Sequence, residues 1–455
     1  LGLCIVVGGY FILLSLILLR GYYLWSLGDS ATHYFYTFDI YSTGYIREGM
    51  IVYPILHLHS CVLMDLLNVD LFTIQKFMPI FLYLLFPLFM FVFSRKLLNS
   101  RKAYLLTLLL SFSLLMYYSY FNEYIPQLLA DVFLVILLFC VYLSISLKSF
   151  PFIIISIIGI ICSTLLHPLC SIMTILFIIA MSFNLYVMRN DQKSVKSRHI
   201  ASVVYVDSFR LILLTIATVF LIWWISMFNA FDYGITSAAN LLFSESELSQ
   251  VSRVEGLYSL GQYYGYNMGL EIVKRYLANL VYIFGGIFII CLCILDLLLN
   301  KKSLSPHFTI LSNFFVLSLI LTGIFFLVDV GVNIWRVVTY PTVIGMFVFS
   351  LVPDCLNDYS KRGLSPSITN TFATGICVVI MFILINGVFI TYPSTYLHMN
   401  NLQITEYDMS GMKFLFSKEN NDYNLVTVEM MSPGRFGRTL LTYDQYKEKK
   451  LHDFK

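Results

Sequence analysis

The residue best suited to carry out chemistry is an aspartate near the start of a long polar loop. Asp29 follows Gly28 just beyond the first hydrophobic segment, and His33 lies four residues further on. A carboxylate in this place could take a proton from an acceptor hydroxyl or hold a divalent cation. On a helix, Asp29 and His33 would share one face, as a base and its partner or as two metal ligands. The alternative is structural, with Asp29 or Ser30 capping a helix in the loop.

Arg336 is the expected phosphate-binding residue. It lies at the end of a later hydrophobic segment. There a guanidinium suits a phosphate or pyrophosphate, because its planar fork binds two oxygens. The alternative is an arginine that extends to the membrane interface beside a tryptophan. His167, at a turn between two other hydrophobic segments, is a weaker candidate for the same phosphate site.

A second acid is expected near Asp29. Glu123 lies in the short loop 122–127. Together with Asp29 and His33 it would complete a site for a divalent metal ion, Mg or Mn. A solvated loop acid without a function is the alternative. Further ionisable residues are expected near the same ends of the hydrophobic segments: Asp39, His57, His59, Asp131 and Asp329.

The composition indicates a membrane protein. The chain of 455 residues is 58% hydrophobic and 12% charged, whereas soluble domains carry about 25% charged residues. The charges are clustered between long uncharged runs, which predict transmembrane helices. The net charge of +3 is small and gives no support to nucleic-acid binding. Most of the nine cysteines lie inside hydrophobic runs, without a CxxC motif, as packing residues do.

The uncharged runs predict an all-α polytopic membrane protein with about eleven transmembrane helices. Short loops rich in Lys and Arg alternate with the other loops, and the positive-inside rule places these basic loops in the cytoplasm. The long loops 20–76 and 232–275 and the tail are then extracytoplasmic, in a multi-pass protein of the plasma membrane. The predicted helices are 3–19, 77–93, 103–121, 128–147, 151–167, 169–188, 211–231, 276–295, 308–328, 337–353 and 372–392.

Two regions are expected along the chain. Residues 1–392 form the transmembrane domain with its two long outer loops. Residues 393–455 form an extracytoplasmic region that reads as the beginning of a small domain, with a capped helix at 408–416 and a strand at 423–429. The segment 3–19 lacks the basic start and the small-residue cleavage site of a signal peptide, so it is read as the first span.

The arrangement resembles the GT-C superfamily of membrane glycosyltransferases. This group includes oligosaccharyltransferase catalytic subunits, protein O-mannosyltransferases and lipid A aminoarabinose transferases, which share a polytopic helical core and an essential acid in a long first outer loop. The Trp-Trp-Asp-Tyr-Gly motif of some members is absent, so binding of a peptide sequon is not expected. The matching residues are Gly28-Asp29 with His33, Gly44, Tyr53-Pro54-Ile55-Leu56-His57, Glu123, 125–130, His167-Pro168 and 336–341.

The resemblance implies transfer of a sugar from a polyprenyl phosphate or pyrophosphate donor to an acceptor glycan, lipid or protein outside the cytoplasm. Asp29 would activate the acceptor or hold the cation, and Arg336 would steady the leaving phosphate. The partners are then membrane lipid, the lipid-linked donor and the acceptor, with no nucleic acid. A polytopic transporter or lipid flippase is the alternative, although neither duplicated halves nor paired mid-span helix breaks are visible. A non-catalytic scaffold would not need outer-face acids clustered near helix ends.

Overall fold

The structure of the chain is a computed structural model. Regular structure in the described residues is α-helical, and one isolated antiparallel bridge joins Leu24 to Ile404. The hydrophobic pattern predicted an all-α chain, and the described helices confirm it. The described residues are 2–24, 28–47, 53–98, 100–117, 123–147, 149–191, 212–223, 236, 265, 267–300, 306–327, 334–361, 365–392, 403–418 and 433–449.

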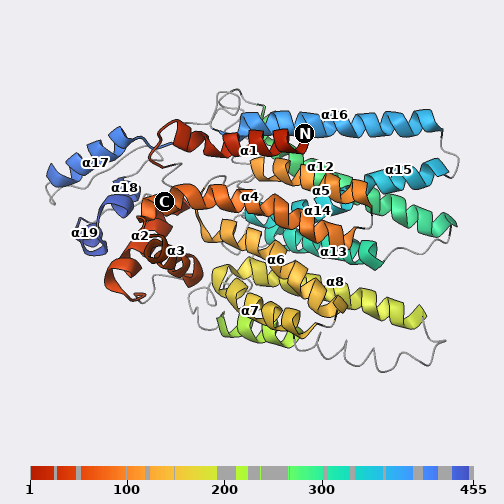
Figure 1. The fold of residues 1–455 in the computed structure, drawn as a ribbon, viewed down its shortest axis with the longest axis horizontal. Helices are drawn as coiled ribbons and strands as arrows, with labels where there is room; N and C mark the ends of the chain where they lie inside the picture. The colour runs from red at the N-terminus through yellow and green to blue at the C-terminus, as the bar shows by residue number, and fades with distance from the viewer. Residues whose placement is uncertain are drawn as a thin grey trace.

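Most of the described helices form a bundle, and the remaining ones cover one end of it (Figure 1). The bundle contains α1 (Gly2–Leu19), α4 (Leu71–Leu97), α5 (Arg101–Met116), α6 (Pro126–Leu147), α7 (Phe150–Leu166), α8 (Pro168–Asp191), α12 (Met268–Asn300), α13 (Pro306–Leu327), α14 (Ile334–Phe349), α15 (Val352–Lys361) and α16 (Pro366–Thr391). The covering helices are α2 (Asp29–Thr43), α3 (Pro54–Leu67), α17 (Glu406–Lys418), α18 (Pro433–Leu440) and α19 (Tyr443–Glu448).

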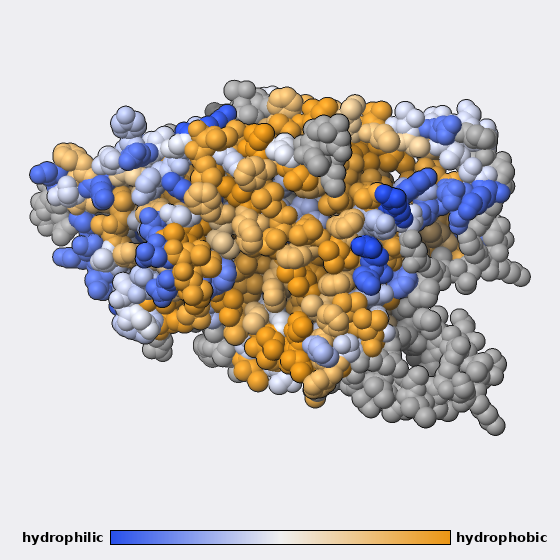
Figure 2. Space-filling view, viewed as in Figure 1, coloured by the Kyte–Doolittle hydropathy of each residue, from blue (hydrophilic) through white to orange (hydrophobic). Residues whose placement is uncertain are grey.

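The helices of the bundle indicate a membrane-embedded protein. Figure 2 shows hydrophobic side chains across the middle of the molecule and hydrophilic side chains at both ends. Each of the eleven predicted segments contains helix in its described residues, but the number of spans stays a prediction. Six segments of the described chain are long and apolar enough to cross a membrane: Leu71–Leu97, Pro126–Leu147, Met268–Leu298, His307–Phe326, Ile334–Lys361 and Ser367–Thr391. Shorter apolar helices include Val6–Leu19, Phe150–Leu166, Pro168–Phe183 and Ile212–Trp223.

The first loop is more ordered than its polarity suggests. It contains α2 and α3, and α4 begins at Leu71 rather than at residue 77. Pro54 starts α3, and Asn68 ends it in the left-handed conformation with φ of 52°. Asp70 caps α4, since its carboxylate accepts a hydrogen bond of 2.6 Å from the Thr73 amide. These local start and stop signals divide the loop into helices.

The C-terminal region packs against the first loop at one end of the bundle, at the left of Figure 1. The two segments therefore lie on the same side of the bundle, as the loop pattern predicts; that this side is extracytoplasmic stays a prediction. The helix predicted at 408–416 is α17, whereas the predicted strand 423–429 and most of loop 232–275 lie outside the described residues. The shared core consists of Leu24, Ala31, Ile404, Met409, Phe416 and Phe436.

An ion pair fixes the C-terminal end of α2. Arg47 donates two hydrogen bonds to the Asp39 carboxylate, at 2.8 and 3.0 Å. Its guanidinium also lies over the Tyr443 ring, 4.4 Å from the ring centroid. The Asp39 side chain is only 5% exposed, and a carboxylate this buried needs a charged partner. Asp39 therefore has a structural position that links α2 to the C-terminal region.

Close packing of α12 against α14 sets the position of Arg336. A Cβ atom on Gly345 would lie 2.6 Å from the carbonyl oxygen of Tyr282, so this approach requires glycine. Near the start of α14, the Trp335 ring stacks on Tyr276 with a centroid separation of 3.9 Å. These two contacts hold α14, and with it Arg336, against α12.

We expect Ile404→Ala to weaken the docking of the C-terminal region. Ile404 is fully buried, and truncation of a buried isoleucine typically costs about 2–5 kcal/mol. Thermal unfolding of the purified protein in detergent should show a lower melting temperature. Phe414→Ala is the control, because Phe414 on α17 is 66% exposed. An equal effect of the two substitutions would contradict the shared core.

Candidate functional site

Asp29 and Arg336 are in contact although 307 residues separate them in the sequence. Nη2 of Arg336 donates a hydrogen bond of 2.5 Å to Oδ2 of Asp29. The Arg336 side chain is 24% exposed and the Asp29 side chain is 46% exposed. An ion pair this open to solvent contributes only about 0–1 kcal/mol to stability. The predicted catalytic acid and the predicted phosphate-binding arginine therefore share one site, and both are accessible to a ligand.

Asp29 is the first residue of α2 and does not cap it. Gly28 occupies the N-cap position, and the helix has no side-chain cap. The capping alternative for Asp29 is therefore wrong. Nε2 of Gln75 donates to the carbonyl oxygen of Ser30 at 3.2 Å, which holds the start of α2 against α4. The positive end of the helix dipole also favours a negative charge at this position.

Two histidines beside Asp29 form a directed chain of hydrogen bonds. Nδ1 of His57 lies 3.0 Å from the carbonyl oxygen of Tyr53, which can only accept, so the His57 proton is on Nδ1. Nε2 of a neutral His57 ring then accepts, and Nδ1 of His33, 3.2 Å away, must donate to it. Nε2 of His33 consequently carries a lone pair that can accept a proton or a hydrogen bond.

Burial keeps the histidines of the site neutral. It lowers the pKa of His57 from 6.5 to about 4, although the hydrogen bond to the Tyr53 carbonyl acts in the opposite direction. Burial also lowers the pKa of His33, helped by the nearby His57, Arg336 and His167. It lowers the pKa of His167 to about 3, with a further contribution from Arg336. Arg336 is therefore a permanent positive charge beside rings that hydrogen-bond without adding charge.

His167 lies at the turn between α7 and α8. Its side chain is buried, and its ring stacks on Tyr53 with a centroid separation of 5.2 Å. Among the described residues, the buried Nδ1 atom has no hydrogen-bond partner. Buried polar atoms are nearly always paired, so this nitrogen marks a place for a ligand atom or a water molecule. The electrostatic effect of Arg336 on His167 places the two predicted phosphate-binding residues near each other.

The side chains predicted to bind a metal ion have other partners. Asp29 pairs with Arg336, and Nδ1 of His33 faces His57. In the described part of the chain, no group of three or more His, Cys, Asp or Glu side chains is arranged to hold a metal ion. These contacts use Oδ2 of Asp29 and Nδ1 of His33, so a divalent ion would be held by Oδ1 of Asp29 and Nε2 of His33. The metal ion stays a prediction.

Glu123 lies three residues before α6, in a segment that contacts α3. The hydroxyl oxygen of the neighbouring Tyr124 lies 2.9 Å from Nδ1 of His59 and accepts a longer hydrogen bond of 3.5 Å from Ser60. Burial lowers the pKa of His59. His59, another candidate from the sequence, therefore connects α3 to the start of α6, and Glu123 does not join Asp29 and His33 in a metal-binding group among the described residues.

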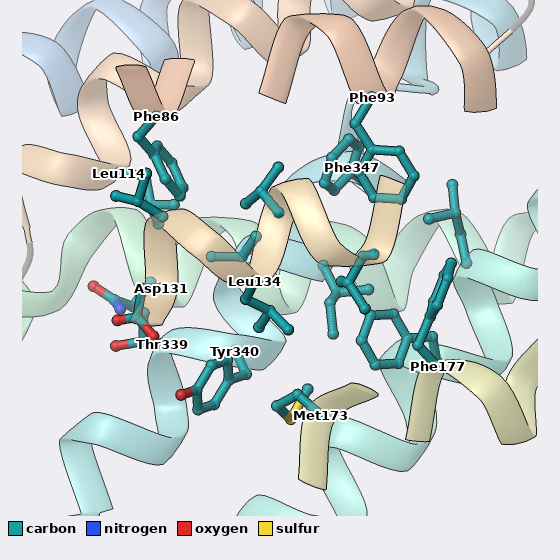
Figure 3. A pocket seen from close by; sticks show the side chains of 18 of the residues that line it. Phe86, Phe93, Leu114, Asp131, Leu134, Met173, Phe177, Thr339, Tyr340 and Phe347 are labelled. Atoms are coloured by element: carbon teal, nitrogen blue, oxygen red, sulfur yellow. The ribbon is translucent and has the colours of Figure 1, made fainter. Parts of the chain in front are cut away.

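An elongated apolar cavity of about 50 Å³ lies inside the bundle, among α4, α6, α8, α13 and α14 (Figure 3). Asp131 and Tyr340 lie at one end of it, and phenylalanine rings including Phe93 lie at the other. Nε2 of Gln127 donates to Asp131 at 2.9 Å and to the Tyr340 hydroxyl at 3.0 Å. The volume has room for only a few water molecules. Because Tyr340 is one helical turn from Arg336 on α14, the polar end of the cavity lies close to the Asp29 site.

Sequence reasoning missed two parts of this site. The role of Tyr53 was not predicted, although an aromatic residue before Pro54 at a helix start was a usable signal. Arg438 of α18 was not a candidate at all, yet its Nη1 atom donates to the Thr32 hydroxyl, next to His33. Nothing in the local sequence indicates this contact, because α18 meets α2 only in the folded protein.

The neutral histidines predict that the protein loses stability in acid. The unfolded His57 side chain has a pKa of 6.5 and the folded one a pKa of about 4. Between these values the unfolded chain binds more protons, so the free energy of unfolding falls as the pH falls from 6.5 toward 4. From His57 alone, moving from neutral pH to pH 5 should cost about 2 kcal/mol. Thermal unfolding at the two pH values measures this loss.

The matched variant for this measurement is His57→Gln. Glutamine keeps a donor for the Tyr53 carbonyl but does not titrate, so the variant should lose less stability on acidification than the wild type. An identical pH dependence in both proteins would show that His57 does not titrate in the way its burial predicts.

The sequence matches no protein-family model and no curated protein. The structure itself shows a helical protein with the features of membrane embedding and a polar site at one end of its bundle. The first loop, α14 and the turn between α7 and α8 supply the side chains of that site, and the C-terminal region packs beside it.

Proposed function

We propose that this chain is a membrane glycosyltransferase of the GT-C type, which moves a sugar from a polyprenyl phosphate or pyrophosphate to an extracytoplasmic acceptor. The observation that carries the proposal is the contact between Asp29 and Arg336 at the end of the bundle. Group transfer needs a base for the acceptor and a positive charge for the leaving group, and this pair supplies both. A donor with a lipid tail would place its phosphate beside this pair at the end of the bundle, and its tail would lie against the bundle.

In the proposed reaction, the hydroxyl oxygen of the acceptor attacks the anomeric carbon of the sugar. The bond between that carbon and the phosphate oxygen breaks, and its electron pair leaves with the polyprenyl phosphate. The hydroxyl proton passes to the Asp29 carboxylate. Negative charge therefore moves from Asp29 to the leaving phosphate, and Arg336, which lies beside Asp29, can stabilise the charge in both places.

The other side chains of the site position the donor. The Arg336 fork can bind two phosphate oxygens at once, which fixes the orientation of the phosphate. His167 offers its buried Nδ1 atom to a phosphate oxygen. Because burial keeps His33, His57 and His167 neutral, these rings add no charge to the site, and arginine supplies the positive charge that binds the anion.

Asp29→Asn tests the catalytic part of the proposal. The substitution keeps the size of the side chain but removes its negative charge and its basicity. Loss of a general base typically lowers the rate by about a hundredfold to ten-thousandfold. The measurement is transfer of sugar by the purified protein, with a panel of lipid-linked sugar donors and with each variant at matched expression.

Asp70→Asn is the control for this experiment. Asp70 lies in the same loop and caps α4, and asparagine caps a helix about as well as aspartate, so transfer should be unchanged. Asp39→Asn is a poorer control, because it disturbs the ion pair with Arg47. Transfer at the wild-type rate by Asp29→Asn would remove the catalytic assignment.

A transporter or lipid flippase is the second candidate function, and Asp131 is the observation that favours it. Asp131 lines the cavity inside the bundle, and ionisable residues that face the interior of a membrane bundle often mark a transport pathway. For a transporter, Asp131→Asn should abolish movement of the substrate across proteoliposomes, and Asp29→Asn should have the smaller effect. The transferase proposal expects Asp29→Asn to cause the larger loss of activity.

A further inference from the structure

A second arginine reaches the same face of α2 from the C-terminal region. Nη1 of Arg438 in α18 donates to the hydroxyl oxygen of Thr32 at 2.5 Å. Thr32 is three residues from Asp29, which holds Arg336. Side chains three residues apart on a helix are neighbours, with Cβ atoms about 5–6 Å apart. The two guanidinium groups, from α14 and α18, therefore attach to adjacent positions on one face of α2.

The side chains along this face of α2 are compatible with a bound anion. His33 follows Thr32 directly and is neutral, because burial lowers its pKa. Tyr36 is one turn further on, and burial raises the pKa of its hydroxyl, although the nearby Arg438 acts in the opposite direction. Asp29, the acid on this face, is paired with Arg336.

We propose that Arg336 and Arg438 together bind a diphosphate group, with one phosphoryl group on each arginine. The two phosphoryl groups of a diphosphate share a bridging oxygen, so their recognition needs two cations close together. Arg336 and Arg438 contact positions three residues apart on α2. A guanidinium binds phosphate oxygens through charge-assisted hydrogen bonds from its planar fork of N–H donors. The buried Nδ1 atom of His167, close to Arg336, is an independent sign of a ligand at this place.

The positions of the two arginines also give the diphosphate a direction. Arg336 belongs to a helix of the bundle, and Arg438 belongs to the C-terminal region that covers its end. A lipid diphosphate would place its lipid-proximal phosphoryl group on Arg336 and its distal phosphoryl group on Arg438. The identity of the donor rests on the proposed function. The diphosphate site implies that this donor carries its sugar on a pyrophosphate, and that the C-terminal region is part of the binding site.

The experiment is titration of the purified full chain with inorganic pyrophosphate and with inorganic phosphate. The wild type should bind pyrophosphate more tightly than phosphate. Arg438→Gln should weaken pyrophosphate binding about tenfold or more, as expected for loss of a charge-assisted hydrogen bond, and should change phosphate binding little. Arg336→Gln should weaken the binding of both anions. Lys447→Gln is the control, because it removes an exposed positive charge from the same region.

Three results would overturn the site: no preference for pyrophosphate in the wild type, unchanged pyrophosphate binding in Arg438→Gln, or an equal loss in Lys447→Gln. If thermal unfolding shows that Arg438→Gln is misfolded, Thr32→Val provides the same test. It keeps the shape of the side chain but removes the oxygen that holds Arg438, so pyrophosphate binding should weaken while phosphate binding is retained; unchanged pyrophosphate binding again overturns the site.

A second comparison distinguishes the source of the diphosphate and separates this proposal from the transferase proposal. Farnesyl diphosphate should bind more tightly than uridine diphosphate; the reverse order would retain the site and overturn the lipid donor. Asp29→Asn should keep its pyrophosphate binding while it loses sugar transfer. Transfer at the wild-type rate by Asp29→Asn would reject the transferase proposal, and the binding results would still decide the diphosphate site.

Discussion

The pairing of Asp29 with Arg336 is the interaction around which the polar site is arranged, and it depends on the rest of the fold to bring the two residues together. It joins the first turn of α2 to the first turn of α14, and other contacts fix the position of each of these helices. Gln75 fixes the start of α2, and the approach at Gly345 fixes α14. The pair itself contributes little to stability because it is open to solvent. The packing of the bundle therefore brings Asp29 and Arg336 together, because the ion pair alone contributes too little free energy to do so.

Burial of the neighbouring histidines makes that open pair the centre of charge in the site. A buried imidazole stays neutral because desolvation penalises its charged form. In the neutral His57 ring, Nδ1 donates its proton to the Tyr53 carbonyl. The other nitrogen, Nε2, then accepts a hydrogen bond from His33. The protein thereby surrounds Arg336 with polar atoms of defined direction, and it avoids the repulsion that several positive charges would cause.

The sequence predicted the parts of this structure that depend on local composition. Uncharged runs located the helices of the bundle, because each helix must satisfy its own backbone hydrogen bonds in an apolar environment. The first loop was harder: α3 is apolar but contains His57, His59 and Asp65, so it does not stand out as a hydrophobic run. Asp29 and Arg336 were each identified from their places at the ends of hydrophobic segments.

What could not be predicted is which of these residues meet. The contact between Asp29 and Arg336 depends on how the helices pack, and so do the link from His33 to His57 and the contact of Arg438 with Thr32. For the proposed metal ligands, the sequence likewise predicted a shared helix face but not the contacts of the side chains. Asp29 and His33 do share a face of α2, and packing gives each of them a protein partner that their spacing in the sequence does not indicate.

The separation of the partners along the chain has a consequence for biogenesis. Asp29 is synthesised 307 residues before Arg336, and Thr32 is synthesised 406 residues before Arg438. While the early helices enter the membrane, the first loop carries its acid without the arginine that will face it. α14 must join the bundle before the pair can form. α18 must then pack against a loop that was synthesised much earlier. A partly synthesised chain that lacks α14 is thus unable to bring Asp29 and Arg336 together.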